Sequence, residues 1–226
     1  MPDPLPPKAL GGHRRPAPIV GVVLAGGRAR RFGGIDKGLV EVAGRPMIEW
    51  IVAALRPQVD ALLINANRNE ARYRATGLRV LGDRLPDFQG PLAGIAAALE
   101  QTPAGGAVLT VPCDSPLPPP RLAERLAAAL ADRGADLAVA HDGERLQWVH
   151  ALIPVALADS LDAFLAGGER KVEAWFGRHR MAVVDFADCR GHFLNLNRLE
   201  DLASVEALLH DNRAATPTGP ADDGAA

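Results

Sequence analysis

Short apolar runs alternate with longer stretches of helical periodicity along most of the chain. The apolar runs predict strands over Ile19–Leu24, Ala61–Ala66, Arg79–Leu81, Ala107–Val111, Leu137–Ala140, Val149–Ile153 and Met181–Phe186. The helical patterns predict helices over Pro46–Leu55, Glu70–Ala75, Pro91–Glu100, Pro119–Asp132, Val155–Leu165, Glu169–Phe176 and Arg198–Leu209. Strands that alternate with helices in this way are typical of an α/β domain.

Two of the predicted strands, Ile19–Leu24 and Ala107–Val111, are apolar almost without interruption. Strands with this composition are buried on both faces, as they are in parallel sheets covered by helices. The predicted fold class is therefore a three-layer α/β fold, with a mostly parallel, Rossmann-like sheet and helices on both faces. In such sheets, ligands bind beyond the carboxyl ends of the strands, near the point where the strand order reverses.

The length of 226 residues favours one domain, which we place at residues 19–212. Residues 1–18 contain six of the 19 prolines and show no apolar periodicity, so they predict a disordered extension. Residues 213–226 predict a second disordered tail.

The net charge is only -2, from 25 basic and 27 acidic residues. This balance argues against a general affinity for nucleic acid or for anionic membranes. No apolar run approaches the ~20 residues that a membrane-spanning helix needs. The two cysteines form neither a disulfide framework nor a zinc motif, so we expect a reducing, cytoplasmic location.

The segment Leu24–Gly38 follows the first buried strand and is rich in glycine and positive charge. It carries Arg28, Arg30, Arg31 and Lys37 against a single acidic residue, Asp36. Glycines allow backbone N–H groups to approach an anion closely, so the segment predicts a polyphosphate site. It matches neither GxGxxG nor GxxxxGK[ST]. The alternative is a surface loop with solvated arginines.

Asp114 follows the buried strand Ala107–Val111 and lies between prolines that stiffen the turn. A carboxylate held there can bind Mg²⁺, which prefers oxygen ligands and shares them with substrate phosphates. Alternatively, Asp114 caps the helix that follows Pro118. Asp83, at the end of another strand, fits a ligand or a turn role equally well. The segment Gly90–Gly94 begins a helix and offers either an anion site or a close packing point.

Taken in order, these motifs resemble the bacterial molybdenum cofactor guanylyltransferases of the MobA type. The resemblance covers about residues 19–210. It rests on the Leu-Ala-Gly-Gly opening with its downstream Asp-Lys, together with the segments Asn65–Arg68, Asp83, Gly90–Gly94, Pro112–Pro116, His141–Arg145, Gly168–Arg170 and Asn195–Asn197.

The resemblance implies transfer of GMP from GTP to molybdenum-molybdopterin, with release of pyrophosphate and Mg²⁺ as the cofactor. It implies catalytic roles for Lys37, Arg31 and Asp114, with Asp114 as the metal ligand. The implied nucleotide-binding residues are Leu24, Ala25, Gly26, Gly27, Lys37, Asn65, Asp83 and Asp114. The implied pterin-side residues are Gly90, Gly94, Asn195 and Asn197.

The same resemblance divides the domain into a nucleotide half, about residues 19–118, and a pterin-side half, about residues 119–212. Molybdenum insertion proteins and molybdoenzyme chaperones are candidate partners, whereas nucleic acid and membrane are not. One departure concerns the pterin side: Gln147–His150 lacks the proline expected after the Asp-Gly-Glu-Arg segment.

Because the terminal phosphate of molybdopterin is already an anion, the reaction needs no protein nucleophile or catalytic base. His141, His150 and His192 are therefore interpreted as structural or substrate-lining. Three alternatives share the predicted phosphate loop: a CMP transferase acting on molybdopterin, a nucleotidyltransferase acting on another phosphorylated small molecule, and a regulator that binds GTP without turnover.

Overall fold

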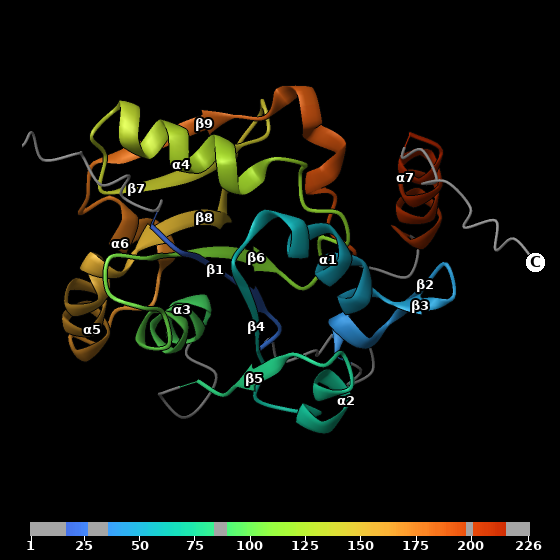
Figure 1. Cartoon of the computed structure of the whole chain (residues 1–226), viewed down its shortest axis with the longest axis horizontal. Helices are drawn as coiled ribbons and strands as arrows, with labels where there is room; N and C mark the ends of the chain where they lie inside the picture. The colour runs from blue at the N-terminus through green and yellow to red at the C-terminus, as the bar shows by residue number, and fades with distance from the viewer. Residues whose placement is uncertain (1–16, 27–35, 84–89, 198–200, 216–226) are drawn as a thin grey trace, which may run out of the picture.

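The computed structural model describes residues 17–26, 36–83, 90–197 and 201–215. Its centre is a seven-stranded sheet with the strand order β5-β4-β1-β6-β8-β7-β9 (Figure 1). The strands are β1 (Ile19–Leu24), β4 (Ala61–Asn65), β5 (Arg79–Leu81), β6 (Ala107–Pro112), β7 (Leu137–His141), β8 (Leu146–Pro154) and β9 (Met181–Asp185).

Six of the seven strands run in the same direction, and β8 alone runs antiparallel to its neighbours β6 and β7. The predicted mostly parallel sheet is confirmed. Strand β1 has β4 on one side and β6 on the other, so the order of the strands reverses at β1. The carboxyl ends of β1, β4 and β6 consequently meet at the edge where an α/β sheet binds its ligand.

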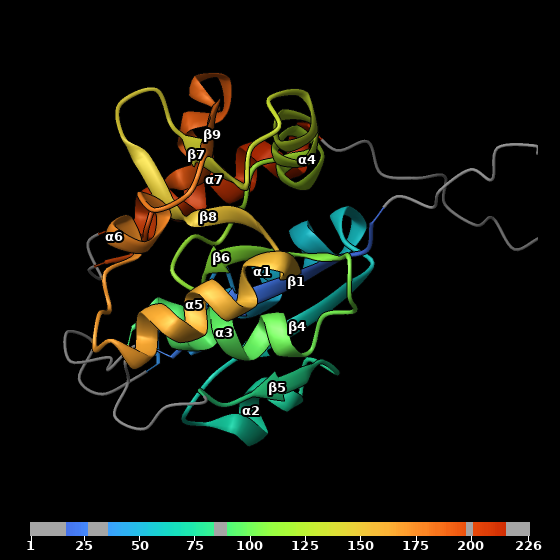
Figure 2. The same ribbon diagram turned by 90° about the vertical axis from the view of Figure 1, so that its left-hand side faces the viewer.

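Helices cover both faces of the sheet, which confirms the predicted three layers. The apolar residues of α1 (Met47–Leu55) and α4 (Leu122–Asp132) pack on one face. Those of α3 (Pro91–Glu100), α5 (Ala158–Ala166) and α6 (Val172–Phe176) pack on the other. Both ribbon views place α3 and α5 side by side (Figures 1 and 2).

Two further helices lie at the periphery. Helix α2 (Glu70–Arg74) precedes β5, and α7 (Leu202–Ala215) lies beside the small hairpin of β2 (Glu41–Val42) and β3 (Arg45–Pro46). In Figure 1, α7 and this hairpin lie at the end of the molecule opposite α5. None of the helices in the described part of the chain has the length and apolar character needed to cross a bilayer.

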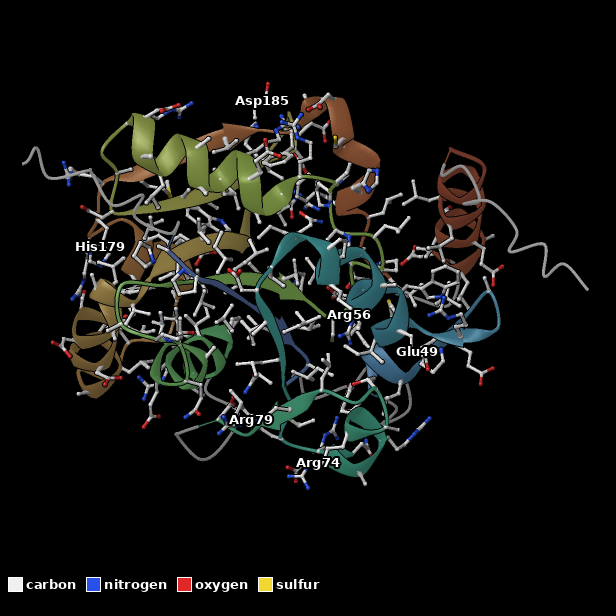
Figure 3. All side chains as sticks on the ribbon, viewed as in Figure 1. Glu49, Arg56, Arg74, Arg79, His179 and Asp185 are labelled. Carbon is white, nitrogen blue, oxygen red and sulfur yellow. The ribbon has the colours of Figure 1, made fainter. Side chains whose placement is uncertain are left out.

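Most apolar side chains are buried and most charged side chains are exposed, as the apolar pattern predicts. Val22, Val23 and Val108 on the central strands are fully buried. In contrast, charged residues such as Arg74 and Asp185 project from the outside of the ribbon (Figure 3). Burial of the two apolar faces supplies the main stabilisation of the three-layer fold.

The elements differ from the predicted ones in several places, and four examples show the reasons. The β2–β3 hairpin was missed because two-residue strands carry no periodicity. Strand β8 is longer than predicted and begins at Leu146. Helix α4 begins at Leu122 rather than Pro119, since consecutive prolines disfavour helical backbone in the residues before them. Helix α6 begins at Val172 rather than Glu169.

The C-terminal helix also differs from its prediction. Helix α7 runs from Leu202 to Ala215, beyond residue 212, where we placed the end of the domain. The first part of its predicted range, residues 198–200, lies outside the described residues, as do residues 1–16 and 216–226. The predicted disorder of the two tails therefore stays a prediction.

Candidate active site

The first group of candidate residues lies at the carboxyl ends of β1, β4 and β5. The buried Asn65 donates from Nδ2 to Asp83 Oδ1 at 3.0 Å. Asn67 donates from Nδ2 to Asp83 Oδ2 at 2.6 Å and accepts the Asp83 backbone N–H at 2.7 Å. The Asp83 carboxylate is thus oriented by two amides, and the predicted pair of Asn65 and Asp83 does come together.

The backbone of β1 joins this group to the neighbouring strands. The N–H of Ala25 donates to the carbonyl of Asn65 at 2.8 Å, and the carbonyl of Leu24 accepts the N–H of Cys113 at 3.1 Å. A Cβ on Gly26 would lie 3.3 Å from Asn67 Nδ2 and 3.4 Å from Asn65 Oδ1. Three predicted nucleotide-binding residues, Leu24, Ala25 and Gly26, therefore adjoin the Asn65–Asp83 pair.

Gly94 packs against the same group. A Cβ built on Gly94 would lie 2.2 Å from Asn65 Oδ1 and 2.9 Å from Leu24 Cδ2. The absence of a side chain therefore lets α3 approach the end of β4. Gly90, the N-cap of α3, has a φ of 84° and lies near the carbonyl of Arg170. The predicted pterin-side role of both glycines stays a prediction, while the described contacts of Gly94 are with predicted nucleotide-side residues.

Replacing Gly94 by alanine is expected to destabilise the fold by about 1–3 kcal/mol, the usual cost of overpacking a tight site. Within an exposed helix the same change stabilises by up to about 1 kcal/mol, so the sign itself is informative. Urea denaturation measures the difference. Gly167→Ala is the matched control, because its φ is -71° and its added Cβ would lie 3.4 Å from the nearest atom. A Gly94→Ala protein as stable as the wild type would contradict the close packing.

The second group surrounds Lys37, at the start of the short 3-10 helix η1 (Lys37–Leu39). Its Nζ donates to Asp114 Oδ2 at 2.9 Å and to Asn197 Oδ1 at 2.8 Å. The side chains of Lys37 and Asp114 are about one-fifth exposed, at 22% and 21%. The predicted site residues Lys37, Asp114 and Asn197 come from distant parts of the chain and thus meet at the lysine ammonium group.

The helix-cap interpretation of Asp114 is wrong. Helix α4 has Arg121 as its N-cap, with no side-chain cap hydrogen bond. Asp114 instead lies just beyond β6, and its backbone carbonyl accepts the N–H of Leu196 at 2.8 Å. This bond brings the segment after β9 against the end of β6.

Asn195 is held in the same place by a second contact. The hydroxyl of Ser115, which is buried, donates to Asn195 Oδ1 at 2.5 Å. Asn195 and Asn197 therefore lie on either side of Leu196, which is fully buried and anchors the segment in the core. The structure brings both predicted pterin-side asparagines next to Asp114.

An ion pair with a buried carboxylate holds the backbone immediately before Lys37. Asp36, only 3% exposed, accepts hydrogen bonds from the Arg68 guanidinium and, at 2.8 Å, from Asn69 Nδ2. Asn69 has a φ of 49°, a left-handed conformation that asparagine tolerates. The end of the predicted phosphate loop is therefore anchored to the segment after β4.

Sequence reasoning gave no role to three residues of this site: Asn67, Arg68 and Asn69. The signal was present, because four of the five residues Asn65–Asn69 are polar and lie at the end of a strand. Their partners, Asp36 and Asp83, are distant in the sequence, and so the contacts could not be read from it.

The predicted site residues Gly27 and Arg31 lie outside the described residues, as do Arg28, Arg30, Gly33 and Gly34. Their roles stay predictions. The structure describes the two residues that flank this loop. Gly26 lies beside the group of Asn65 and Asp83. Asp36 directly precedes Lys37 of the second group.

The nearby thiol and phenol are poor nucleophiles. Burial, with Asp114 as the next contributor, raises the pKa of Cys113 to about 12, which keeps the thiol protonated. Burial also raises the pKa of Tyr73 well above its usual range. His141 accepts a hydrogen bond from the Gly143 N–H, and His192 lies 3.2 Å from the Leu117 carbonyl, so both fit structural roles. These groups support a reaction without a protein nucleophile.

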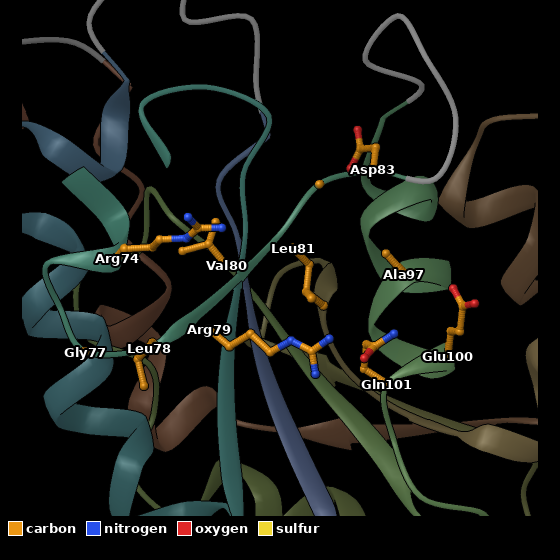
Figure 4. A pocket seen from close by; sticks show the side chains of 11 residues that line it. Arg74, Gly77, Leu78, Arg79, Val80, Leu81, Asp83, Ala97, Glu100 and Gln101 are labelled. Carbon is orange, nitrogen blue, oxygen red and sulfur yellow. The ribbon is translucent and has the colours of Figure 1, made fainter. Parts of the chain in front are cut away.

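A groove of about 720 Å³ follows the outer edge of β5 (Figure 4). Its lining residues come from β5, from the end of α2 and from α3, and they include Arg79, Glu100 and Gln101. The groove ends at Asp83, so it approaches the first group of residues from the edge of the sheet.

The family profile of the MobA-like NTP transferase domain matches residues 21–184. The chain belongs to this family. It is 50% identical over 186 residues to a protein of Shewanella putrefaciens named molybdenum cofactor guanylyltransferase, covering 82% of this chain and 95% of that one. A Cupriavidus pinatubonensis protein of the same name is 50% identical over 194 residues, covering 84% and 96%.

A solved structure also shares the fold of this MobA-like transferase. Molybdopterin-guanine dinucleotide biosynthesis protein A of Archaeoglobus fulgidus superposes with a TM-score of 0.70 over 85% of this chain and 99% of that chain. The identity is 23%, so this comparison supports the fold alone. The predicted nucleotidyltransferase fold is confirmed.

Proposed function

We propose that this enzyme transfers GMP from GTP to molybdenum-molybdopterin and releases pyrophosphate, forming the guanine dinucleotide cofactor. The observation that carries the proposal is the 50% identity to proteins named molybdenum cofactor guanylyltransferase, over nearly their full length. The geometry supports it, because the two groups of residues lie at the switch point of the sheet, where an α/β fold binds nucleotides.

In this proposal the two groups of residues bind different parts of the substrates. Asn65 and Asp83, which are hydrogen-bonded to each other, would face the nucleotide base, and the neighbouring Gly26 would leave room for it. Lys37 and Asp114, which form an ion pair, would lie at the phosphates. Asn195 and Asn197 lie on the acceptor side of the same carboxylate, so the two substrates would meet at Asp114.

In the reaction, an oxygen of the acceptor's terminal phosphate forms a bond to the α-phosphorus of GTP. The bond between the α-phosphorus and the bridging oxygen breaks, and its electrons leave with pyrophosphate. Lys37 would stabilise the charge that develops, because its ammonium already lies at the junction of the two substrate sides. Holding two anionic reactants in line is the main task of the protein.

The oxygens around Lys37 also fit a magnesium ion. Its ammonium is a cation seated between a carboxylate oxygen and an amide oxygen, which are hard ligands of the kind that Mg²⁺ prefers. Within the described residues there is no cluster of three or more potential metal-binding acidic, histidine or cysteine side chains. Asp114 would therefore hold the ion together with substrate phosphates and water, and the bound ion would polarise the α-phosphate.

The remaining predictions about context are part of this proposal. We place the reaction in the cytoplasm, with GTP and molybdenum-molybdopterin as substrates. Delivery by molybdenum insertion proteins and transfer to molybdoenzyme chaperones also stay predictions. The proposed contacts with the pterin, made by Gly90, Gly94, Asn195 and Asn197, also stay predictions.

The identity of the nucleotide base is tested by thermal unfolding of the protein with each of the four NTPs and Mg²⁺. GTP is expected to raise the melting temperature most, since a ligand at a hundred times its Kd stabilises by about 2.7 kcal/mol. Mass spectrometry of the pterin product, from protein loaded with molybdopterin, then identifies the transferred nucleotide. Equal stabilisation by CTP, or a cytosine dinucleotide product, would replace the guanylyl assignment with the CMP alternative.

Pyrophosphate release separates a transferase from a regulator that only binds GTP. The expected result is release that requires GTP, Mg²⁺ and the acceptor together. GTP binding without release in the presence of acceptor would contradict the proposal.

A further inference from the structure

Strand β8 contains a large bulge close to Asp114. Its register with β7 passes from Val139↔Ala151 directly to Ala140↔Gln147. The three residues between, Trp148, Val149 and His150, have no register partner on β7. The pairing of β8 with β6 ends at Thr110↔Ala151, so these three residues have no register partner on β6 either. Bulges of this kind re-aim side chains and are common beside active sites.

The bulge opens the sheet into a pocket. The pocket has a volume of about 610 Å³ and is lined by Pro112, Asp114, Arg145, Leu146, Gln147, Trp148, Val149, His150 and Asn195. It therefore lies between the end of β6 and the bulged part of β8, and one side of it is formed by the residues that we place at the reacting phosphate. A volume of several hundred Å³ is that of a small-molecule site.

The wall of the pocket combines aromatic surface with fixed polar groups. The half-buried Trp148 is supported from behind by an edge contact with Phe176, with ring centroids 6.0 Å apart. Gln147 is held by a 2.5 Å hydrogen bond from its Nε2 to Asp142 Oδ2. Arg145 adds a largely exposed guanidinium, with 72% of its side chain exposed. A flat ring that carries hydrogen-bonding edges suits such a wall.

His150 is the second observation that points to a ligand. It is 1% exposed, its ring packs edge-on against Phe193 at 4.9 Å, and its Nε2 has no hydrogen-bond partner within the described residues. A buried polar atom without a partner costs free energy, which a ligand in the pocket can recover when the ring turns its Nε2 towards the pocket. Burial lowers the pKa of His150 to about 3, so the ring is neutral and carries both a donor and an acceptor.

We propose that the bulge Trp148–His150 binds the pterin ring of the acceptor, with Trp148 stacking on the ring and His150 Nε2 bonding to its edge. The inference rests on the proposed function and names the part of the chain that recognises the second substrate. The pterin phosphate then points towards Asp114 and Asn195, at the other side of the same pocket.

The proposal explains the departure noted in the sequence. Trp148 stands in the segment where a proline was expected, and a proline there would provide no aromatic face. Trp148 and His150 are accordingly specificity-determining residues for the acceptor, whereas the nucleotide side of the site is independent of them.

Binding of neopterin monophosphate, a 6-substituted pterin phosphate, tests the proposal by isothermal titration with the whole protein. The wild type is expected to bind it saturably. Trp148→Ala is expected to raise its Kd by about tenfold or more, as loss of a stacking platform does. Trp148→Phe, which keeps an aromatic face, is expected to recover most of the affinity. His150→Phe fills the same space without the nitrogen and is expected to raise the Kd about fivefold.

Met181→Ala is the matched control. Met181, like Trp148, is a partly buried residue packed against the core on the side of α5 and α6, but it does not line the pocket. Its variant is expected to bind neopterin monophosphate as the wild type does. The Kd of GTP with Mg²⁺ is expected to stay within about twofold in all four variants, because separate sites contribute independently.

The outcomes separate this proposal from the proposed function. The pocket assignment alone would be overturned if the wild type forms dinucleotide from GTP while Trp148→Ala has the same KM for molybdopterin and the same Kd for neopterin monophosphate as the wild type. Absence of saturable neopterin monophosphate binding to the wild type would also overturn it. A wild type that binds the pterin phosphate through Trp148 but releases no pyrophosphate from GTP would overturn the transferase proposal and leave the pocket in place.

Discussion

Asp114→Asn is expected to lower pyrophosphate release by at least about a hundredfold, the scale at which loss of one preorganised electrostatic group is felt. Asparagine keeps the shape of the side chain and its hydrogen bonding, but it removes the charge that would hold Mg²⁺. The bonds that fix the backbone here, from Leu196 N–H to the Asp114 carbonyl and from Cys113 N–H to the Leu24 carbonyl, are untouched. We therefore expect the apo protein to fold normally, as judged by circular dichroism.

Asp136→Asn is the control for this variant. Asp136 also pairs with a cation, Arg180 at 2.7 Å, but it directly precedes β7, at the amino ends of the parallel strands, away from the site. Its substitution is expected to leave pyrophosphate release unchanged. An Asp114→Asn enzyme that still works near the wild-type rate at limiting Mg²⁺ would overturn the assignment of Asp114 as the metal ligand.

Lys37→Ala is expected to cause a loss of similar size, about a hundredfold, in the same assay. The ammonium of Lys37 is the group that connects Asp114 with Asn197. In the proposed reaction it would stabilise the charge that develops as pyrophosphate leaves. The stability loss is expected to be only about 1 kcal/mol, because this ion pair is partly exposed and water can replace the lysine. Activity and the melting temperature, measured on the same preparation, check both parts.

Two further variants define what is lost. Lys37→Arg retains a positive charge and is expected to recover part of the activity. Arg180→Ala breaks the surface pair with Asp136 and is expected to leave activity unchanged. Unfolding of Lys37→Ala would indicate a structural role for the lysine. Full activity in a folded Lys37→Ala protein would remove it from the catalytic residues.

The fold was readable from the sequence because its elements depend on local patterns. Continuous apolar runs such as Ile19–Leu24 and Ala107–Val111 can be buried only within a sheet covered on both faces, which predicts three layers without any knowledge of contacts. Boundaries were less certain where local signals compete, as at the prolines before α4 and in the two-residue strands of the β2–β3 hairpin.

The chemistry of the site was also visible in part. Lys37 and Asp114 were predicted because a cation in a glycine-rich segment and a carboxylate at a strand end are typical of phosphate and metal binding. Their direct contact, 77 residues apart in the chain, was not predicted. It depends on the order of the strands, which places β1 beside β6, and on the segment after β9 that returns to Asp114.

The sequence by itself determined the elements, the layers and the types of residue available for phosphate transfer, because these follow from periodicity and from side-chain chemistry. Only the tertiary structure decided which of these residues share a site. The anchoring of Asp36 by Arg68 and Asn69, the close packing of Gly94 on Asn65, and the bulge that opens a pocket beside Asp114 all arise where distant segments meet. Such contacts depend on which strands are neighbours in the sheet, and the order of the strands leaves no periodic signal in the chain.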